Sequence, residues 1–225
     1  MANNYYDATG VLVLDRITPV IAALFSGFKL DASYPGNGQA YIARIAEDNE
    51  PDWDTIYENL VDLAVSSNLP VSTEDIPPMD ELLAVFAKHF GADHDEALMN
   101  LIEQHGFDDV VDVDALFLIA TRFNDGHNLK EICLEGCWHC SKARLFEFGG
   151  DGYYWSHEFE TFSASGQAIQ LGREIRRALL SSDLDTAATA IERETTRLLS
   201  GINDEAQRKQ LHRRVIGQLS ANSEA

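Results

Sequence analysis

Three cysteines and a histidine within eight residues form the part of the sequence whose residue types and spacing could support chemistry. The stretch Cys133-Leu-Glu-Gly-Cys-Trp-His-Cys140 contains every cysteine of the chain. Thiolate sulfur and imidazole nitrogen are ligands of zinc, and thiolates also hold iron–sulfur clusters. Whether these side chains converge on one point depends on the backbone that carries them.

A strand over residues 130–141 would place alternate side chains on opposite faces of a sheet. Cys133, Glu135, Cys137 and His139 would then share one face, with Trp138 and Cys140 on the other. The cysteine spacing resembles the cluster-binding loop of radical-SAM enzymes, but a strand keeps three thiolates from converging. Only 85 residues follow Cys140, and their pattern is mostly helical. We therefore expect no iron–sulfur cluster.

A zinc site remains an alternative interpretation of the same residues. Cys133, Cys137 and His139 could share a face, and Glu147 on a following strand could join them. The chain has no second Cys-x-x-Cys motif or histidine pair, which four-ligand structural zinc sites normally include. We expect no metal and no cofactor, with the cysteines buried as small apolar side chains. The pattern leaves open whether Cys133, Cys137 and His139 bind a metal.

The predicted polar face of this sheet is the best place for an enzyme site. It would carry a histidine with carboxylates and a hydroxyl, which could support acid–base chemistry, although a solvated sheet face gives the same pattern. No phosphate-binding loop, dinucleotide fingerprint, nucleophile elbow or zinc-protease motif occurs in the chain. A small enzyme is therefore our second hypothesis, with a site at Glu135, His139, Glu147, Ser156 and Glu158.

The charge of the chain is strongly negative and unevenly distributed. Asp and Glu number 37 against 17 Lys and Arg, which gives a net charge of −20. Residues 45–115 hold 19 acidic residues and one basic residue, Lys88. Such a field repels nucleic acid and membrane phosphates and attracts basic protein surfaces. We therefore expect no direct binding to nucleic acid or membranes.

These carboxylates predict a non-enzymatic interaction protein. We expect a phosphate-like surface that binds a basic partner, such as a DNA- or RNA-binding protein, in the manner of a nucleic-acid mimic. Helix capping and simple solvation are the alternative, because Asp54, Asp80, Asp93 and Asp112 fall where helices should begin. The predicted partner-binding residues are Asp48, Glu50, Asp52, Asp54, Glu58 and Asp62.

Basic residues near the end of the chain suggest a third hypothesis, a DNA-associated factor. These residues share one predicted helix, where a solvated face is the simpler explanation. The negative charge of the rest of the chain also opposes the approach of DNA. The residues are Arg208, Lys209, Arg213 and Arg214.

The hydrophobic pattern predicts an α+β fold in which a small, largely antiparallel sheet is covered by several helices. The chain opens as a strand (11–15), a helix after Thr18-Pro19 and a strand (39–46), followed by four helices. Strands are predicted at 130–141, 144–148 and 153–162, with Gly149-Gly-Asp-Gly152 as a hairpin turn, and three helices follow. We expect one α+β domain over residues 1–163, with an acidic helical block at 47–125. Helices in residues 164–225 should pack on the same domain.

The beginning of the chain, MANNYYDATG, lacks the basic and apolar segments of a secretory signal. No stretch approaches the ~18 consecutive apolar residues that cross a bilayer. An odd number of clustered cysteines fits a reducing compartment. We expect a cytoplasmic protein, and the sequence leaves its oligomeric state open.

Several stretches resemble a family of uncharacterised accessory proteins encoded on integrative and conjugative elements and plasmids of proteobacteria. The resemblance runs nearly end to end but includes no catalytic motif. It implies a cargo protein of a mobile element, and such elements often carry inhibitors of host restriction or CRISPR defence. The stretches are NYYDATGVLVLDRITPVIAALF, YPGNGQAYIARI, HFGADHDEALMNLIEQH and WHCSKARLFEFGGDG.

Overall fold

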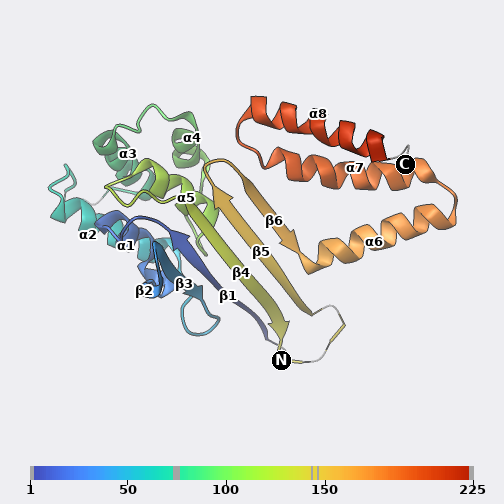
Figure 1. Cartoon of the computed structure of the whole chain (residues 1–225). Helices are drawn as coiled ribbons and strands as arrows, with labels where there is room; N and C mark the ends of the chain where they lie inside the picture. The colour runs from blue at the N-terminus through green and yellow to red at the C-terminus, as the bar shows by residue number, and fades with distance from the viewer. Residues whose placement is uncertain (1–2, 73–76, 143, 146, 223–225) are drawn as a thin grey trace.

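The computed structural model describes residues 3–72, 77–142, 144–145 and 147–222. Within these residues the chain forms eight α-helices, one short 3-10 helix and a six-stranded sheet (Figure 1), which confirms the predicted α+β class. The strands are β1 (Asn4–Val13), β2 (Asp31–Gly36), β3 (Gln39–Arg44), β4 (Glu131–Cys140), β5 (Phe148–Ser156) and β6 (Glu160–Ala164). The helices are α1 (Pro19–Phe25), η1 (Ser26–Phe28), α2 (Trp53–Ser66), α3 (Met79–Phe90), α4 (Glu96–Gln104), α5 (Val113–Arg122), α6 (Ser165–Leu180), α7 (Leu184–Ser200) and α8 (Glu205–Asn222).

The sheet is antiparallel throughout, with strand order β2-β3-β1-β4-β5-β6. Its longest pairing joins β1 to β4 over ten residues, from Asn4 opposite Cys140 to Val13 opposite Glu131. Helices α2 to α5 are inserted between β3 and β4, so neighbouring central strands come from distant parts of the chain. Figure 1 shows the helices α1–α5 gathered at one end of the sheet, while β1, β4 and β5 continue past them.

Helices cover one face of the sheet. Alternation places Ala8, Leu12 and Leu134 on this face, where they are buried with Phe25, Leu60 and other helical side chains in one core. The opposite face, which we call the open face, carries the odd-numbered residues of β1 and β4. Its central residues Thr9, Glu135 and Cys137 are exposed. The predicted alternation of β4 is therefore confirmed.

Helices α2 to α5 form on the apolar stripes that the sequence pattern predicted, but the predicted helix starts at Asp80 and Asp93 are wrong, because α3 begins after Pro78 and α4 after Asp95. Each buries one apolar stripe, for example Ile56, Leu60 and Ala64 on α2. Asp52 caps α2 by accepting a hydrogen bond from the Thr55 amide at 2.8 Å, and Asp95 caps α4 in the same way.

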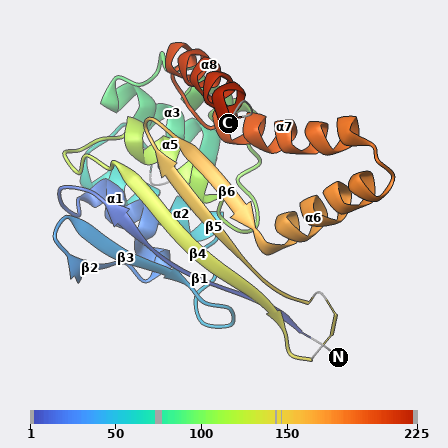
Figure 2. The same ribbon diagram turned by 45° about the vertical axis from the view of Figure 1, so that its right-hand side comes forward.

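Helices α6 to α8 form an extension at the β6 edge of the sheet, which we call the arm (Figure 2). Few arm residues are buried: Ala178 on α6, Ala187, Ala190 and Leu199 on α7, and none on α8 within its described side chains. The arm joins the sheet where the Glu160 amide donates to Gly201 at 2.9 Å and the Arg197 guanidinium donates to the Phe162 carbonyl at 2.7 Å. The sheet edge and the base of α7 are thus tied together.

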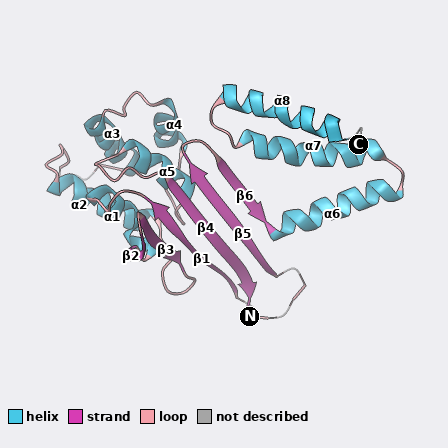
Figure 3. Ribbon diagram, viewed as in Figure 1, coloured by secondary structure: helices cyan, strands magenta, loops and turns pink. Residues whose placement is uncertain are grey.

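The final hairpin differs from the predicted one (Figure 3). Of the predicted strand at 144–148, residues 144, 145 and 147 lie outside any strand, Phe148 begins β5, and residue 146 lies outside the described residues. Gly149-Gly-Asp-Gly152 lies inside β5 instead of forming a turn. The turn falls at residues 157–159. The Ser156 hydroxyl closes it by donating to the Phe159 carbonyl and accepting from the Phe159 amide. A Cβ built on Gly149 would lie 2.1 Å from the Trp138 ring, so glycine is present here for packing. Strand β2, which was not predicted, pairs with β3 at the sheet edge.

Candidate functional site

The predicted acidic surface exists in part as a row of carboxylates on α2. Asp54, Glu58 and Asp62 are exposed and lie four residues apart, so they follow one another along one side of the helix. Four helical residues advance about 6 Å along the axis, which sets the axial spacing of these carboxylates. Among the ion pairs of the described residues, none involves any of the three.

The other predicted partner-binding residues have different environments. Glu50 is exposed, and Asp48 pairs with Lys29. Asp52 is the cap of α2, and the Thr55 hydroxyl and amide hold the pKa of its carboxyl below the ordinary value. Local capping thus accounts for Asp52, and the helix dipole also stabilises Asp54 in the first turn of α2, but neither accounts for Glu58 and Asp62.

A second acidic segment lies beside the beginning of α2. The Trp53 amide donates to the Asp109 carbonyl at 3.2 Å, and the Val111 amide donates to the Pro51 carbonyl at 3.2 Å. This pairing brings three exposed carboxylates against the start of the row. The sequence showed them only as part of the general acidic excess, because their position depends on tertiary pairing. We define the acidic face as Asp48, Glu50, Asp52, Asp54, Glu58 and Asp62 together with Asp108, Asp109 and Asp112.

His105 is the one histidine in contact with the acidic face by a hydrogen bond among the described residues. Its Nε2 lies 2.9 Å from the Asp112 carboxylate, and its ring packs against Trp53 and Phe107. This contact holds the Asp112 carboxylate at the edge of the acidic face.

A pocket of about 310 Å³ borders the acidic face, where the segment 111–114 meets the covered side of the sheet. Its walls include the rings of Tyr6, Tyr153 and Trp155, and Asp114 and Asp151 contribute carboxylates. This volume is at the small end of the range for ligand pockets, and aromatic walls with a few convergent polar groups are typical of them. No local pattern predicted this pocket, because its walls come from seven separate segments.

Hydrogen bonds and charge organise the polar end of this pocket. The Tyr6 hydroxyl donates to the Asp151 carboxylate at 3.0 Å, and the Arg44 guanidinium lies 5.2 Å from the Tyr6 ring centroid. Burial, and after it the Asp151 carboxylate, raises the pKa of Tyr6. The same two causes raise the pKa of Tyr153. Both phenols therefore remain protonated donors. An aromatic pocket with excess carboxylate suits a cationic group.

The residues of the predicted enzyme site do not come together. Glu135 and His139 lie on the open face, whereas Ser156 and Glu158 lie at the far end of β5, because Glu131 pairs with Ser156 and His139 with Phe148. Ser156 is buried and makes turn hydrogen bonds. The Cys140 amide donates a hydrogen bond to the Glu147 carbonyl, so Glu147 lies opposite the buried Cys140 and not opposite His139. Because neighbouring strand residues point to opposite faces, the side chains of Glu147 and His139 do not share a face. The structure instead brings Asp7 of β1 beside Cys137 and His139.

The three cysteines occupy different environments. Cys140 is buried, as expected, but Cys137 is exposed, so the prediction of burial is wrong for this thiol. Cys133 is half-buried, and burial, together with Glu131 and Glu135, raises its pKa. Cys133 and Cys137 lie on the same face, as predicted, yet Cys133 is not part of the cluster that contains Asp7.

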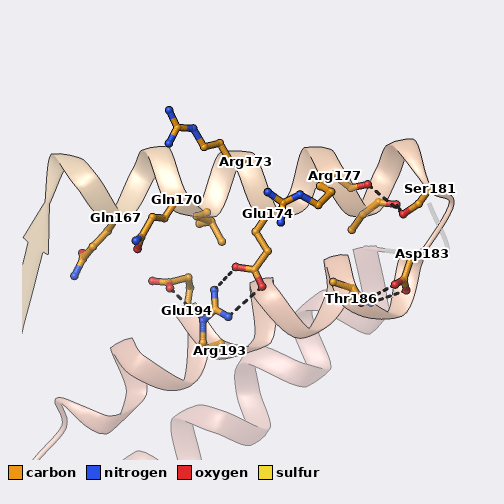
Figure 4. Close-up of a pocket in the computed structure, with 12 residues that line it drawn as sticks. Gln167, Gln170, Arg173, Glu174, Arg177, Ser181, Asp183, Thr186, Arg193 and Glu194 are labelled. Carbon is orange, nitrogen blue, oxygen red and sulfur yellow. Dashed lines mark hydrogen bonds and ion pairs between the residues drawn. The ribbon is translucent and has the colours of Figure 1, made fainter. Parts of the chain in front are cut away.

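A crevice of about 770 Å³ separates α6 from α7 in the arm (Figure 4). Glu174 on α6 accepts two hydrogen bonds from the Arg193 guanidinium on α7, at 3.2 and 2.8 Å, which bridges the crevice. Arg173 and Arg177 also line it. The two helices meet through this polar bridge and small residues, so their larger apolar side chains are left on the outer surfaces.

The basic residues of α8 are dispersed. Lys209 pairs with Glu205 at 2.5 Å, and Arg208 donates to the Ile202 carbonyl at 3.4 Å. Arg213 and Arg214 are exposed. These four residues therefore form no concentrated basic surface that would support the third hypothesis, a DNA-associated factor.

No protein-family model matches the chain. No curated protein and no solved structure matches it either. In the part of the chain that the structure describes, no helix combines the length and the apolar character needed to cross a bilayer. Function therefore has to be inferred from the surfaces of the chain itself.

Proposed function

We propose that this chain is a non-enzymatic interaction protein whose acidic face binds a basic surface of another protein. The uncompensated row Asp54, Glu58 and Asp62 on α2 is the observation that carries the proposal. Mutual repulsion among such carboxylates disfavours the compact state, and ordinary surfaces mix both signs of charge. A basic partner would relieve this repulsion and would be attracted at long range.

The pocket beside the acidic face supplies an anchor for such a partner. Interfaces gain most of their affinity from a few side chains that fill desolvated pockets, with charged residues around them guiding association. Tyr6, Tyr153 and Trp155 provide aromatic walls, and Asp114 and Asp151 provide negative charge. An arginine or lysine side chain of the partner fits this chemistry, because cations bind over aromatic faces and to carboxylates.

The partner class that we propose is a DNA- or RNA-binding protein of the cytoplasm, such as one of host defence, in line with the resemblance of the sequence to mobile-element proteins. One carboxylate per ~6 Å on α2 is about half the charge density of a single DNA strand, which carries one phosphate per ~3.4 Å. The adjoining carboxylates of residues 108–112 are therefore needed to approach the density of nucleic acid.

Competition with DNA tests this proposal. DNA-binding proteins are eluted from immobilised duplex DNA, passed over the immobilised wild-type chain and identified by mass spectrometry. Any retained protein is then titrated with the chain in the presence of labelled duplex DNA. We expect the chain to displace the DNA and the complex to weaken as salt rises, since the Debye length falls from about 10 Å at 0.1 M to about 3 Å at 1 M.

A matched pair of variants localises the binding surface. The test variant neutralises the row (Asp54→Asn, Glu58→Gln, Asp62→Asn), and the control neutralises three exposed acids of the arm (Asp185→Asn, Glu192→Gln, Glu205→Gln). At ~0.2–1 kcal/mol for each exposed charge, the test variant should bind about 3- to 100-fold more weakly. Retention of no DNA-binding protein, equal loss in both variants, or binding that is indifferent to salt would refute the proposal.

A further inference from the structure

Three side chains from the paired strands β1 and β4 form a cluster of metal-binding groups on the open face of the sheet. Oxygen of Asp7, sulfur of Cys137 and nitrogen of His139 all lie within 4.8 Å of one another. Asp7 and Cys137 are direct cross-strand partners in the β1–β4 ladder, and His139 follows two residues later on the same face. The backbone of the two longest-paired strands therefore fixes the positions of all three groups.

We propose that Asp7, Cys137 and His139 bind a zinc ion, with water in the fourth position. Zinc is held by carboxylate, thiolate and imidazole at about 2.0–2.3 Å in tetrahedral geometry, so its ligand atoms lie ~3.3–3.6 Å apart. The observed spread requires movements of about 1 Å, which side-chain rotation supplies without moving the strands. Three protein ligands leave the fourth coordination position of the zinc open for water or another small ligand.

Neighbouring groups orient two of the ligands. The Asp7 carboxylate accepts a hydrogen bond from the Ala46 amide at 2.9 Å through one oxygen, which leaves the other oxygen for the metal. The His139 ring stacks on Tyr5, with the ring centroids 5.2 Å apart. Such outer contacts fix ligand orientation in metal sites.

The open coordination position has room beside it. On β5, the residues opposite Cys137 and Glu135 are Gly150 and Gly152, so the cluster is open on that side, while Phe148 lies opposite His139. A Cβ built on Gly152 would contact nothing within 4 Å. Glu135, exposed on the same face, adds negative charge that favours a divalent cation.

Cobalt substitution tests the site directly. The reduced full-length chain is titrated with Co²⁺ and then Zn²⁺. We expect one equivalent of Co²⁺ to give the visible bands of tetrahedral cobalt and the near-ultraviolet band of a thiolate–cobalt bond, and Zn²⁺ to remove both. Cys137→Ser should abolish the thiolate band, and His139→Ala and Asp7→Asn should each weaken binding by at least about 10-fold.

Cys133→Ser is the control, because it removes a thiol from the same face outside the cluster. This variant should bind cobalt as the wild type does. Asp7→Asn keeps a side-chain oxygen that can accept the hydrogen bond from the Ala46 amide. Thermal unfolding without metal verifies that each variant is folded. The absence of a saturable cobalt band in the wild type, or a thiolate band that survives Cys137→Ser and is lost in Cys133→Ser, would overturn the proposal.

A separate observation concerns the outer surface of the arm. Leu184, Ile191 and Leu198 lie seven residues apart on α7, so they form one stripe, and they are 67%, 55% and 49% exposed. Nine of the fourteen exposed large apolar side chains of the described residues lie in α6–α8. Isolated helices are marginal in water, and helical stability comes mainly from packing of an apolar face.

We infer that a second copy of this chain covers the stripe, with the two α7 helices packed antiparallel about a two-fold axis at Ile191. Leu184 of each copy would then meet Leu198 of the other, as an isologous interface requires. Charge opposes contact between two arms far less than contact between two copies of the remainder, since residues 165–222 hold nine basic and seven acidic residues, whereas residues 1–164 hold eight basic and 29 acidic ones. The 51 residues of α6–α8 can supply the 20–30 residues per side of a standard interface.

Light scattering after size exclusion tests this inference on the full chain. The wild type should be a dimer and Ile191→Glu a monomer, because the substitution places two carboxylates together at the axis. Leu145→Glu is the control, since Leu145 is 82% exposed outside the arm, and it should remain a dimer. In a Cys137→Ser background, Ile191→Cys should form a disulfide between copies, whereas Leu145→Cys should not. A monomeric wild type, or a dimer that survives Ile191→Glu, would refute the pairing.

Discussion

Asp95 connects α4 to α5, and its removal should destabilise the fold by a calculable amount. Its carboxylate accepts a hydrogen bond from the Leu98 amide at 2.9 Å and one from the Arg122 guanidinium at 2.5 Å. Loss of the cap costs about 1 kcal/mol. The ion pair is about a third exposed at each side chain, which limits its contribution to about 1 kcal/mol. Asp95→Ala should therefore lower the free energy of unfolding by about 2 kcal/mol, and the melting temperature by about 4–8 °C.

Asp95→Asn separates the two contributions, because asparagine still caps the helix but does not carry the charge. This variant should lose only about 1 kcal/mol in urea unfolding at pH 7. Arg122 remains partly exposed, so it can be solvated when its partner is removed.

The pH dependence supplies a second test. Burial raises the pKa of Asp95, but the Leu98 amide and the Arg122 guanidinium outweigh it, so the pKa in the fold lies below the ordinary value. The stabilisation is thus complete above the unfolded pKa of about 3.9 and is lost as pH falls through the lower, folded value. The difference between wild type and Asp95→Asn should shrink below about pH 4. Equal losses in the Ala and Asn variants, or a difference that persists in acid, would refute this account.

Two further predictions concern stability, each measured by urea unfolding. A Cβ at Gly10 would lie 2.0 Å from the Cys133 carbonyl oxygen, so Gly10→Ala should lower the free energy of unfolding by more than about 2 kcal/mol. Gly172 lies in open space on α6, so Gly172→Ala should stabilise the fold by about 0.5–1 kcal/mol. The opposite order would contradict the strand geometry. Tyr6→Phe should cost about 1 kcal/mol through the lost bond to Asp151. Because burial and Asp151 raise the pKa of Tyr6, its contribution is complete below about pH 10 and is lost as pH rises further, so the wild type should lose stability in base more steeply than Tyr6→Phe.

Local patterns predicted the elements whose side chains repeat regularly. The stripe of Ile56 and Leu60 marked α2, and the alternation around Cys133 and Cys137 marked β4, because burial on one side imposes a period on the sequence. The same reasoning misplaced the last hairpin. Four residues with three glycines are typical of a turn, yet here glycine makes room for Trp138, and tertiary packing overrides the local signal.

The candidate sites were less accessible to sequence reasoning. Asp54, Glu58 and Asp62 were predicted as surface carboxylates from the acidic excess of residues 45–115. The approach of residues 108–112 to α2, and that of Asp7 to Cys137, depends on pairing between distant segments. A single sequence carries no local trace of such a register, so Asp7 was absent from the predicted metal ligands.

The central position of β1 has a consequence for synthesis of the chain on the ribosome. Its hydrogen-bonding edge toward β4 is completed by residues that emerge roughly 120 positions later. At about 5–20 residues per second, that edge waits for several seconds after the opposite one has joined β3. During this interval the nascent protein presents an unpaired strand, a template for association with other chains. Efficient production in cells should therefore depend on chaperones that shield nascent chains, more than the stability of the finished fold would suggest.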